Sequence, residues 1–246
     1  MKFSRITTSL YIALLLLSLS ASVFGESQLK PEAQQLLEQF KNSKLFWQQL
    51  EIAKKIAALH DASVLSQLEG WLSHEDRHQR GNAAFIFASL GDDRGYITIA
   101  AILEDRSDRP EGQGIATVSS DGRYHVARQI EADRYYAVCL FGDLKDSKAL
   151  PILIPLLNDK EVNYRVLGSL GEIGDKRAIP AILKALDDND PSVRVLAIYA
   201  LEKLDAKEAL PRLQQLVTDN EKSHFDRMVS VAEAAQKAIS KLKIQP

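Results

Sequence analysis

A repeated spacing of apolar residues runs along most of the chain. Three, four, seven and ten residues after Arg194 stand Ala197, Ile198, Leu201 and Leu204. Residues at this spacing share one face of an α-helix. The same spacing recurs when the count starts from Gln49, Arg80, Arg134 and Asn163. The pattern therefore predicts five amphipathic helices that bury equivalent faces.

Each of these helices is followed by a short polar turn and then by a second apolar segment. The turns are His60-Asp61, Gly91-Asp92, Lys145-Asp146, Gly174-Asp175 and Asp205-Ala206. Glycine after a helix supplies a left-handed cap, and aspartate just beyond can cap the next helix. Proline follows in the first turn of the next segment, where no amide hydrogen is needed, at Pro151, Pro180 and Pro211.

The starting positions lie 31, 54, 29 and 31 residues apart, so one unit is longer than the others. Periods of this length are typical of stacked repeats, which predicts an all-α fold: an α-solenoid of about six antiparallel helix pairs. The expected units are Pro31–Leu59, Asp61–Leu90, Asp93–Leu144, Ser147–Ile173, Lys176–Leu204 and Lys207–Leu242. We expect a single repeat domain over residues 26–246, with an insertion at about 106–131 in the third unit.

A resemblance to a known family becomes clear at this point. Gly171-Glu172-Ile173-Gly174-Asp175-Lys176-Arg177-Ala178-Ile179-Pro180, together with Val193-Arg194, resembles the HEAT-like repeats of the phycobilin-lyase type. The resemblance covers most of the chain from Pro31 to Leu242 outside the insertion.

The resemblance implies a superhelix whose second helices line the concave face. It also implies a ladder of ion pairs between neighbouring units, with Arg80, Arg134 and Arg194 as donors and Asp92, Asp146 and Asp175 as acceptors. The lyases of the family act on chromophores. No residues in this chain carry such a role, and we expect that the protein is not an enzyme.

The insertion contains two β-prone runs, 115–120 and 123–127, on either side of Asp121-Gly122. Asp-Gly between such runs is a strong hairpin signal, so we expect a small β-hairpin. The segment also holds groups that could bind an anion: Arg106, Arg109, Arg123, His125 and Arg128. Long loops on a rigid scaffold often carry binding, which makes an anion or small-molecule binder one alternative function.

The first residues have the features of a cleavable signal peptide. Lys2 and Arg5 precede the apolar run Leu10–Leu19, and small residues lead up to Gly25. We therefore expect a signal peptide at 1–25, cleavage after Gly25 and a periplasmic or secreted protein. The run is short for a spanning helix, which needs about 20 residues. Cys139 is the one cysteine, which leaves no internal disulfide, and its apolar surroundings predict a partly buried thiol.

Charge argues against a nucleic-acid partner. The chain of 246 residues has a formal net charge of −2. Without residues 1–25, which hold two basic residues and no acidic ones, 29 basic residues face 33 acidic ones, a net of −4. Nucleic-acid binding requires a basic surface.

His74-Glu75-Asp76-Arg77-His78 matches the zinc-protease pattern His-Glu-x-x-His. A metal-dependent hydrolase using His74, Glu75 and His78 is therefore a second alternative. The register of the repeats opposes it: Asp76 aligns with Asp190, which precedes a helix start, so His74 falls in a turn and does not share a helical face with His78. We expect no metal and no cofactor.

Aromatic residues recur at positions of the second helices that should face away from the core. With one arginine, they are Phe85, Tyr135, Tyr136, Tyr164, Arg165 and Tyr199. Tyrosine and arginine are the residue types that anchor protein interfaces. We therefore expect an exported scaffold that binds another protein or a peptide through its concave second-helix face and the insertion.

Overall fold

A computed structural model describes residues 29–107, 122–224 and 229–244, and the side chains of 122–128 and 244 lie outside what it describes. Regular structure in these ranges is helical, apart from one antiparallel bridge between Lys222 and Ser230. The predicted all-α solenoid is confirmed. Residues 1–25, which we predict to be a signal peptide, lie outside the described residues.

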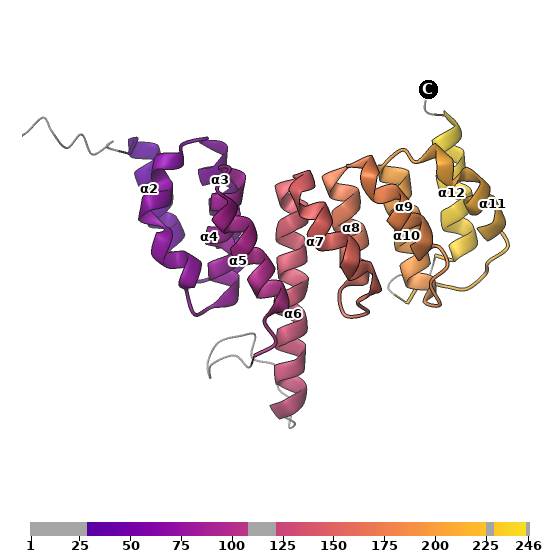
Figure 1. Ribbon diagram of the computed structural model, residues 1–246, viewed down its shortest axis with the longest axis horizontal. Coiled ribbons are helices and arrows are strands. Elements are labelled where there is room, and N and C mark those ends of the chain that lie inside the picture. The colour runs from indigo at the N-terminus through magenta and orange to yellow at the C-terminus, as the bar shows by residue number, and fades with distance from the viewer. Residues whose placement is uncertain (1–28, 108–121, 225–228, 245–246) are drawn as a thin grey trace, which may run out of the picture.

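The second helices of the six units stack side by side in one row (Figure 1). They are α3 (Phe46–Ala58), α4 (Arg77–Ser89), α6 (Gly122–Leu144), α8 (Asn163–Ile173), α10 (Pro191–Lys203) and α12 (Val231–Ile244). Each packs on the next, which is the translational stacking expected of a solenoid.

The first helices form the other layer and are shorter. They are α2 (Pro31–Asn42), η1 (Ala62–Gln67) with η2 (Glu69–Ser73), α5 (Asp93–Glu104), η3 (Ser147–Ala149) with α7 (Leu150–Leu153) and η4 (Ile154–Asn158), η5 (Lys176–Ala178) with α9 (Ile179–Ala185), and η6 (Lys207–Ala209) with α11 (Leu210–Leu216). Several begin as a 3₁₀ turn, a common form of short helical starts.

The apolar spacing of the sequence corresponds to the core. In α4, α6, α8 and α10 the residues three, four and seven positions after the starting residue are fully buried. They are Ala83, Ala84 and Phe87; Ala137, Val138 and Phe141; Val166, Leu167 and Leu170; and Ala197, Ile198 and Leu201. Each set faces its own first helix and both neighbouring units, so one core continues through the stack.

The five predicted turns share one backbone feature. His60, Gly91, Lys145, Gly174 and Asp205 all have positive φ, between 50° and 86°. This left-handed residue ends the second helix, and in four turns the aspartate after it accepts a hydrogen bond from the amide two residues on. Ala206 cannot accept such a bond, and the last first helix lacks that side-chain cap.

Glycine at the Lys145 position should therefore stabilise the protein. A β-carbon disfavours the left-handed region by about 1–2 kcal/mol. Glycine avoids this cost, but its greater freedom in the unfolded state offsets part of the gain in stability. We expect Lys145→Gly to raise the free energy of unfolding by up to about 1 kcal/mol in urea titrations. Gly174→Ala is the reciprocal control and should lower it, and a loss of stability in Lys145→Gly would contradict the assignment of this turn.

The row of second helices bends sharply over α4. Lys54 of α3 and Asp143 of α6 form an ion pair of 3.0 Å across α4, and the rings of Phe46 and Tyr136 lie 5.1 Å apart in edge contact. Helices two places apart in a row can touch only if the row curves toward them. The second-helix side is therefore concave here, as the repeat resemblance implies.

The insertion differs from the sequence prediction. Residues 123–127, predicted as the second strand of a hairpin, belong to α6, which protrudes beyond the other helices of the row (Figure 1). The reason is that the helix-favouring residues Ala127, Arg128, Gln129 and Glu131 continue the segment without a break into the repeat helix. The hairpin prediction is wrong for this half, and 108–121 lie outside the described residues.

Within the described ranges, no helix combines the length and the apolarity that crossing a bilayer requires.

Candidate functional site

His74 and His78 have separate structural surroundings. Asp76 caps α4 as predicted, accepting hydrogen bonds from the amides of His78 and Gln79. His74 lies in the preceding turn, where its Nδ1 accepts from the Asp76 amide and its ring stacks on Trp71 at 5.1 Å.

His78 lies in the first turn of α4 and is buried. Its ring stacks on Phe46 at 4.2 Å, and its Nε2 lies 3.5 Å from Asp133, which also pairs with Arg77 at 2.9 Å. The two imidazoles therefore face different neighbours. In the part of the chain that the structure describes, no group of three or more His, Cys, Asp or Glu side chains is placed to hold a metal ion.

An arginine ladder links neighbouring units, but with other acceptors than predicted. Arg134 donates to Asp159, 25 residues later, at 2.5 Å and to the Leu103 carbonyl at 2.8 Å. Arg194 donates to Asp219, also 25 residues later, at 3.0 Å. Arg80 lies 3.8 Å from Asp105 at the equivalent place.

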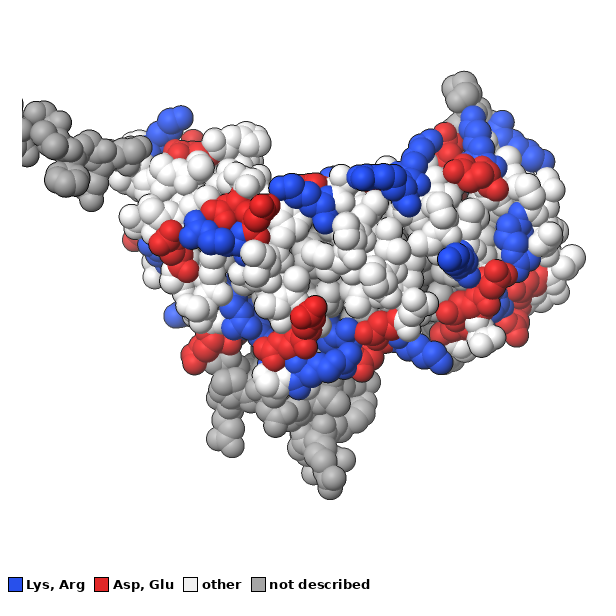
Figure 2. All heavy atoms as spheres, in the orientation of Figure 1, with Lys and Arg blue, Asp and Glu red and all other residues white. Residues whose placement is uncertain are grey.

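The predicted acceptors Asp92, Asp146 and Asp175 cap helices at the opposite end of the units. The ladder aspartates instead follow the first helices, beside the N-terminal ends of the second helices. In Figure 2 blue and red side chains alternate along this lower margin of the stack. These side chains join neighbouring units.

Of the side chains predicted to bind an anion, the structure describes only that of Arg106. Arg106 lies 2.9 Å from Glu161 and 3.7 Å from Asp159, so carboxylates already balance its charge. Arg109 lies outside the described residues, as do the side chains of Arg123, His125 and Arg128. Their role in binding stays a prediction.

Two members of the predicted aromatic surface belong to the core. Phe85 is 5% exposed and Tyr136 is 9% exposed, and the bend brings Phe46 of α3 onto the Tyr136 ring. The Tyr136 hydroxyl donates to Asn82 Oδ1, and Asn82 Nδ2 donates in turn to Gln49 Oε1 at 2.9 Å. Their predicted exposure is wrong because register on a single helix carries no information on the curvature of the row.

The other members form an open surface, which we call the tyrosine face. It consists of Tyr135 on α6, Tyr164 and Arg165 on α8, and Tyr199 on α10. Tyr135 and Tyr199 are 38% and 37% exposed, and the centroids of the Tyr135 and Tyr164 rings lie 5.8 Å apart. The Arg165 guanidinium lies 5.9 Å from the centroid of the Tyr135 ring and 2.8 Å from Glu172. Three successive helices thus present tyrosine rings on one side.

Small residues lie between these rings. Gly168 of α8 lies under the Arg165 guanidinium, where an added β-carbon would come within 3.3 Å of Nη1. Cys139 of α6 is half-buried, as predicted, and burial raises the pKa of its thiol. Burial likewise raises the pKa values of Tyr135 and Tyr164. At neutral pH the thiol and both hydroxyls therefore keep their protons, so the centre of the face holds one ion pair among uncharged groups.

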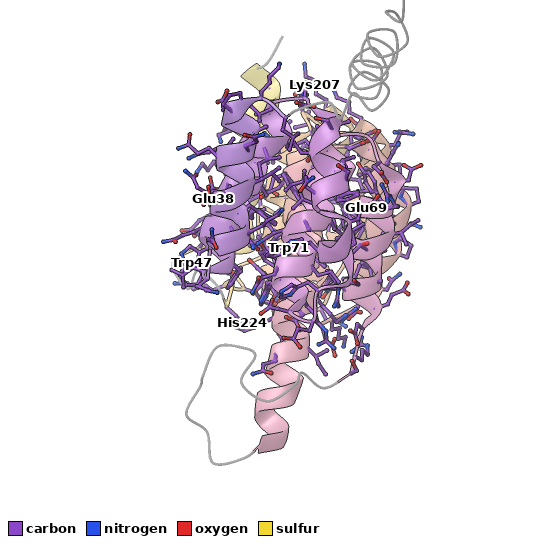
Figure 3. The ribbon with its side chains drawn as sticks, turned by 90° about the vertical axis from the view of Figure 1, so that its left-hand side faces the viewer. Glu38, Trp47, Glu69, Trp71, Lys207 and His224 are labelled. Carbon is purple, nitrogen blue, oxygen red and sulfur yellow. The ribbon has the colours of Figure 1, made fainter. Side chains whose placement is uncertain are left out.

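Trp47 is a further exposed aromatic residue that the sequence analysis missed. It is 52% exposed at the start of α3, beside Phe46, whose ring contacts Tyr136 next to Tyr135. Viewed along the stack, Trp47 lies on one side of the molecule and Glu69 of the first-helix layer on the other (Figure 3). The repeat register could have identified it: Trp47 lies two residues before Gln49, on the same helical face as the positions five residues after each starting residue, such as Tyr199.

Comparison with known proteins identifies the repeats. The HEAT repeats family matches residues 150–235, and the PBS lyase HEAT-like repeat matches residues 133–159. No curated protein matches the chain. The chain carries HEAT-like repeats, as the sequence resemblance indicated.

Two solved structures are similar to this chain. One is the complex of CpcE and CpcF of phycocyanin lyase from Nostoc sp. PCC7120, with 24% identity, a TM-score of 0.48 and 72% of this chain covered. This chain spans 64% of that lyase chain. The other is an engineered protein, with 18% identity, a TM-score of 0.42, and 87% of this chain and 97% of that chain covered.

These matches correct one expectation. The match of residues 133–159 to the PBS lyase HEAT-like repeat overturns the expectation that the chain is not an enzyme.

Proposed function

We propose that this HEAT-repeat protein is an exported scaffold that binds another protein or a peptide through the tyrosine face. The observation that carries the proposal is the row of tyrosine rings, Tyr135, Tyr164 and Tyr199, from three successive second helices. Exposed tyrosines beside an arginine are typical of the residues that contribute most to protein interfaces.

The rigidity of the scaffold supports this role. α6, α8 and α10 are held by a continuous core and by the arginine ladder, so the rings need little ordering when a partner binds. Binding by side chains that are already fixed in place loses less entropy. Gly168 and Cys139 are small, so the Arg165 guanidinium can lie low between the rings.

A random-peptide display library tests the proposal. We expect the wild-type chain to enrich peptides that the variant Tyr135→Ala/Tyr199→Ala fails to retain. Ile97→Ala is the control, because Ile97 is an even more exposed apolar residue, at 68%, and lies on the first-helix layer. Thermal melts should show all three proteins folded. Enrichment that persists in the double variant, or that Ile97→Ala abolishes, would contradict the proposed face.

Export is tested at the N-terminus. Expressed from its full sequence in a bacterium with a periplasm, the protein should appear in the periplasmic or secreted fraction with Glu26 as its first residue. A chain that keeps Met1 and stays in the cytoplasm would overturn this part of the proposal.

A further inference from the structure

We propose that the partner of the tyrosine face is a proline-rich, uncharged segment in polyproline II conformation, lying across α6, α8 and α10. This rests on the proposed function and specifies the chemistry of its partner. Three features lead to it: the kind of side chain on the face, its charge and the spacing of its helices.

The first feature is the row of aromatic rings. Trp47, Tyr135 and Tyr199 are three of the five large apolar residues that are exposed among those described, and all three come from second helices. Proline rings pack well on aromatic faces, and grooves lined by aromatic residues are the usual recognition surface for proline-rich segments.

The second feature is charge. The arginine at the centre of the face is paired, because Arg165 lies 2.8 Å from Glu172, and two further pairs lie on the neighbouring second helices, Lys54 with Asp143 at 3.0 Å and Lys241 with Glu202. A charged group placed over the centre of the face would have to displace one member of the Arg165–Glu172 pair or lie beside a like charge. The face is therefore complementary to an uncharged segment.

The third feature is spacing. Packed helices lie about 8–10 Å apart. A polyproline II chain advances about 3.1 Å per residue, so three residues cover about 9 Å. Every third residue of such a segment would meet the next helix of the row. The conformation has no internal hydrogen bonds and is already populated in the free chain, so little ordering is needed on binding.

The test uses four fluorescein-labelled peptides of about nine residues, a length that spans three helices at this rise. One is uncharged with proline at every third position, one has alanine in place of each proline, and two have acidic or basic residues at the remaining positions. We expect saturable polarisation changes with the uncharged proline peptide. Its dissociation constant should rise at least about tenfold in Tyr135→Ala/Tyr199→Ala and stay the same in Ile97→Ala. It should change less than about twofold when salt rises from about 50 to about 500 mM.

Binding of the alanine peptide as tight as that of the proline peptide would overturn the inference, as would preference for a charged peptide. If display selection gives tyrosine-dependent peptides without regularly spaced prolines, the inference fails and the proposed function stands. If no peptide depends on Tyr135 and Tyr199, both fail.

Discussion

Replacing Tyr136 with alanine is expected to lower the free energy of unfolding by about 3–5 kcal/mol. The ring fills the junction of three second helices, with Phe46 of α3 and His78 of α4 in edge contact at 5.1 and 4.7 Å. Truncation leaves a cavity there. It also removes the hydroxyl that satisfies Asn82 Oδ1 within a buried polar network reaching Gln49 and the Phe40 carbonyl. Both losses act in the same direction.

Tyr135→Ala is the control, since the two tyrosines are adjacent on α6 and differ in exposure. Exposed truncations change stability little, so we expect no more than about 1 kcal/mol. Tyr136→Phe separates the two losses, because it keeps the ring and leaves the amide oxygen unpaired, at a cost of about 1–3 kcal/mol. Urea unfolding followed by circular dichroism measures all three. Equal losses from Tyr135→Ala and Tyr136→Ala would show that the bend over α4 does not exist in solution.

Arg134→Ala is expected to destabilise the protein by about 2–3 kcal/mol. The buried guanidinium donates to Asp159, Glu161 and the Leu103 carbonyl, and so joins the third unit to the fourth. Its removal leaves the two carboxylates beside each other with only the exposed Arg106 as a cation. Both are partly exposed and regain water, which keeps the loss below that of a fully buried pair. Arg177→Ala is the control, because Arg177 also pairs with an aspartate but is solvent-exposed, and its loss should not be measurable.

The effect of Arg134 should depend on pH. The hydrogen bond from Arg134 holds the pKa of Asp159 below its usual value of 3.8. A lowered folded-state pKa contributes stability above the unfolded value, and this contribution is lost as pH falls through the folded value. The gap in stability between wild type and Arg134→Ala should therefore be constant above about pH 5 and shrink below pH 4. A gap that widens in acid would contradict this ion pair.

The sequence predicted those features that depend on one unit or its immediate neighbours. The apolar spacing located the second helices, and the positive-φ turns at Gly91 and Gly174 followed from glycine chemistry. Asp76 was recognised as a cap because its register matches Asp190. Each of these depends on local propensity or on the period of the repeat, and both can be read from one chain.

What could not be predicted depends on the arrangement between units. Whether Tyr136 is core or surface depends on the bend that brings α3 to α6, and the register of α6 is the same in either case. The ladder acceptors were misplaced because aspartate occurs at both ends of the first helices in the third and fourth units, and geometry selects Asp159 over Asp146. The start of α6 was misread because Asp-Gly is a turn signal only where the flanking residues pair as strands.

Photo-crosslinking from the tyrosine face tests the central claim most directly. A benzoylphenylalanine residue would replace Tyr199 in one variant and Ile97 in another, two exposed positions on opposite layers of the stack. After irradiation in cells that express the protein, we predict a crosslinked partner from position 199 and none from position 97. A partner that crosslinks from 97 and not from 199 would contradict a binding face on the second helices.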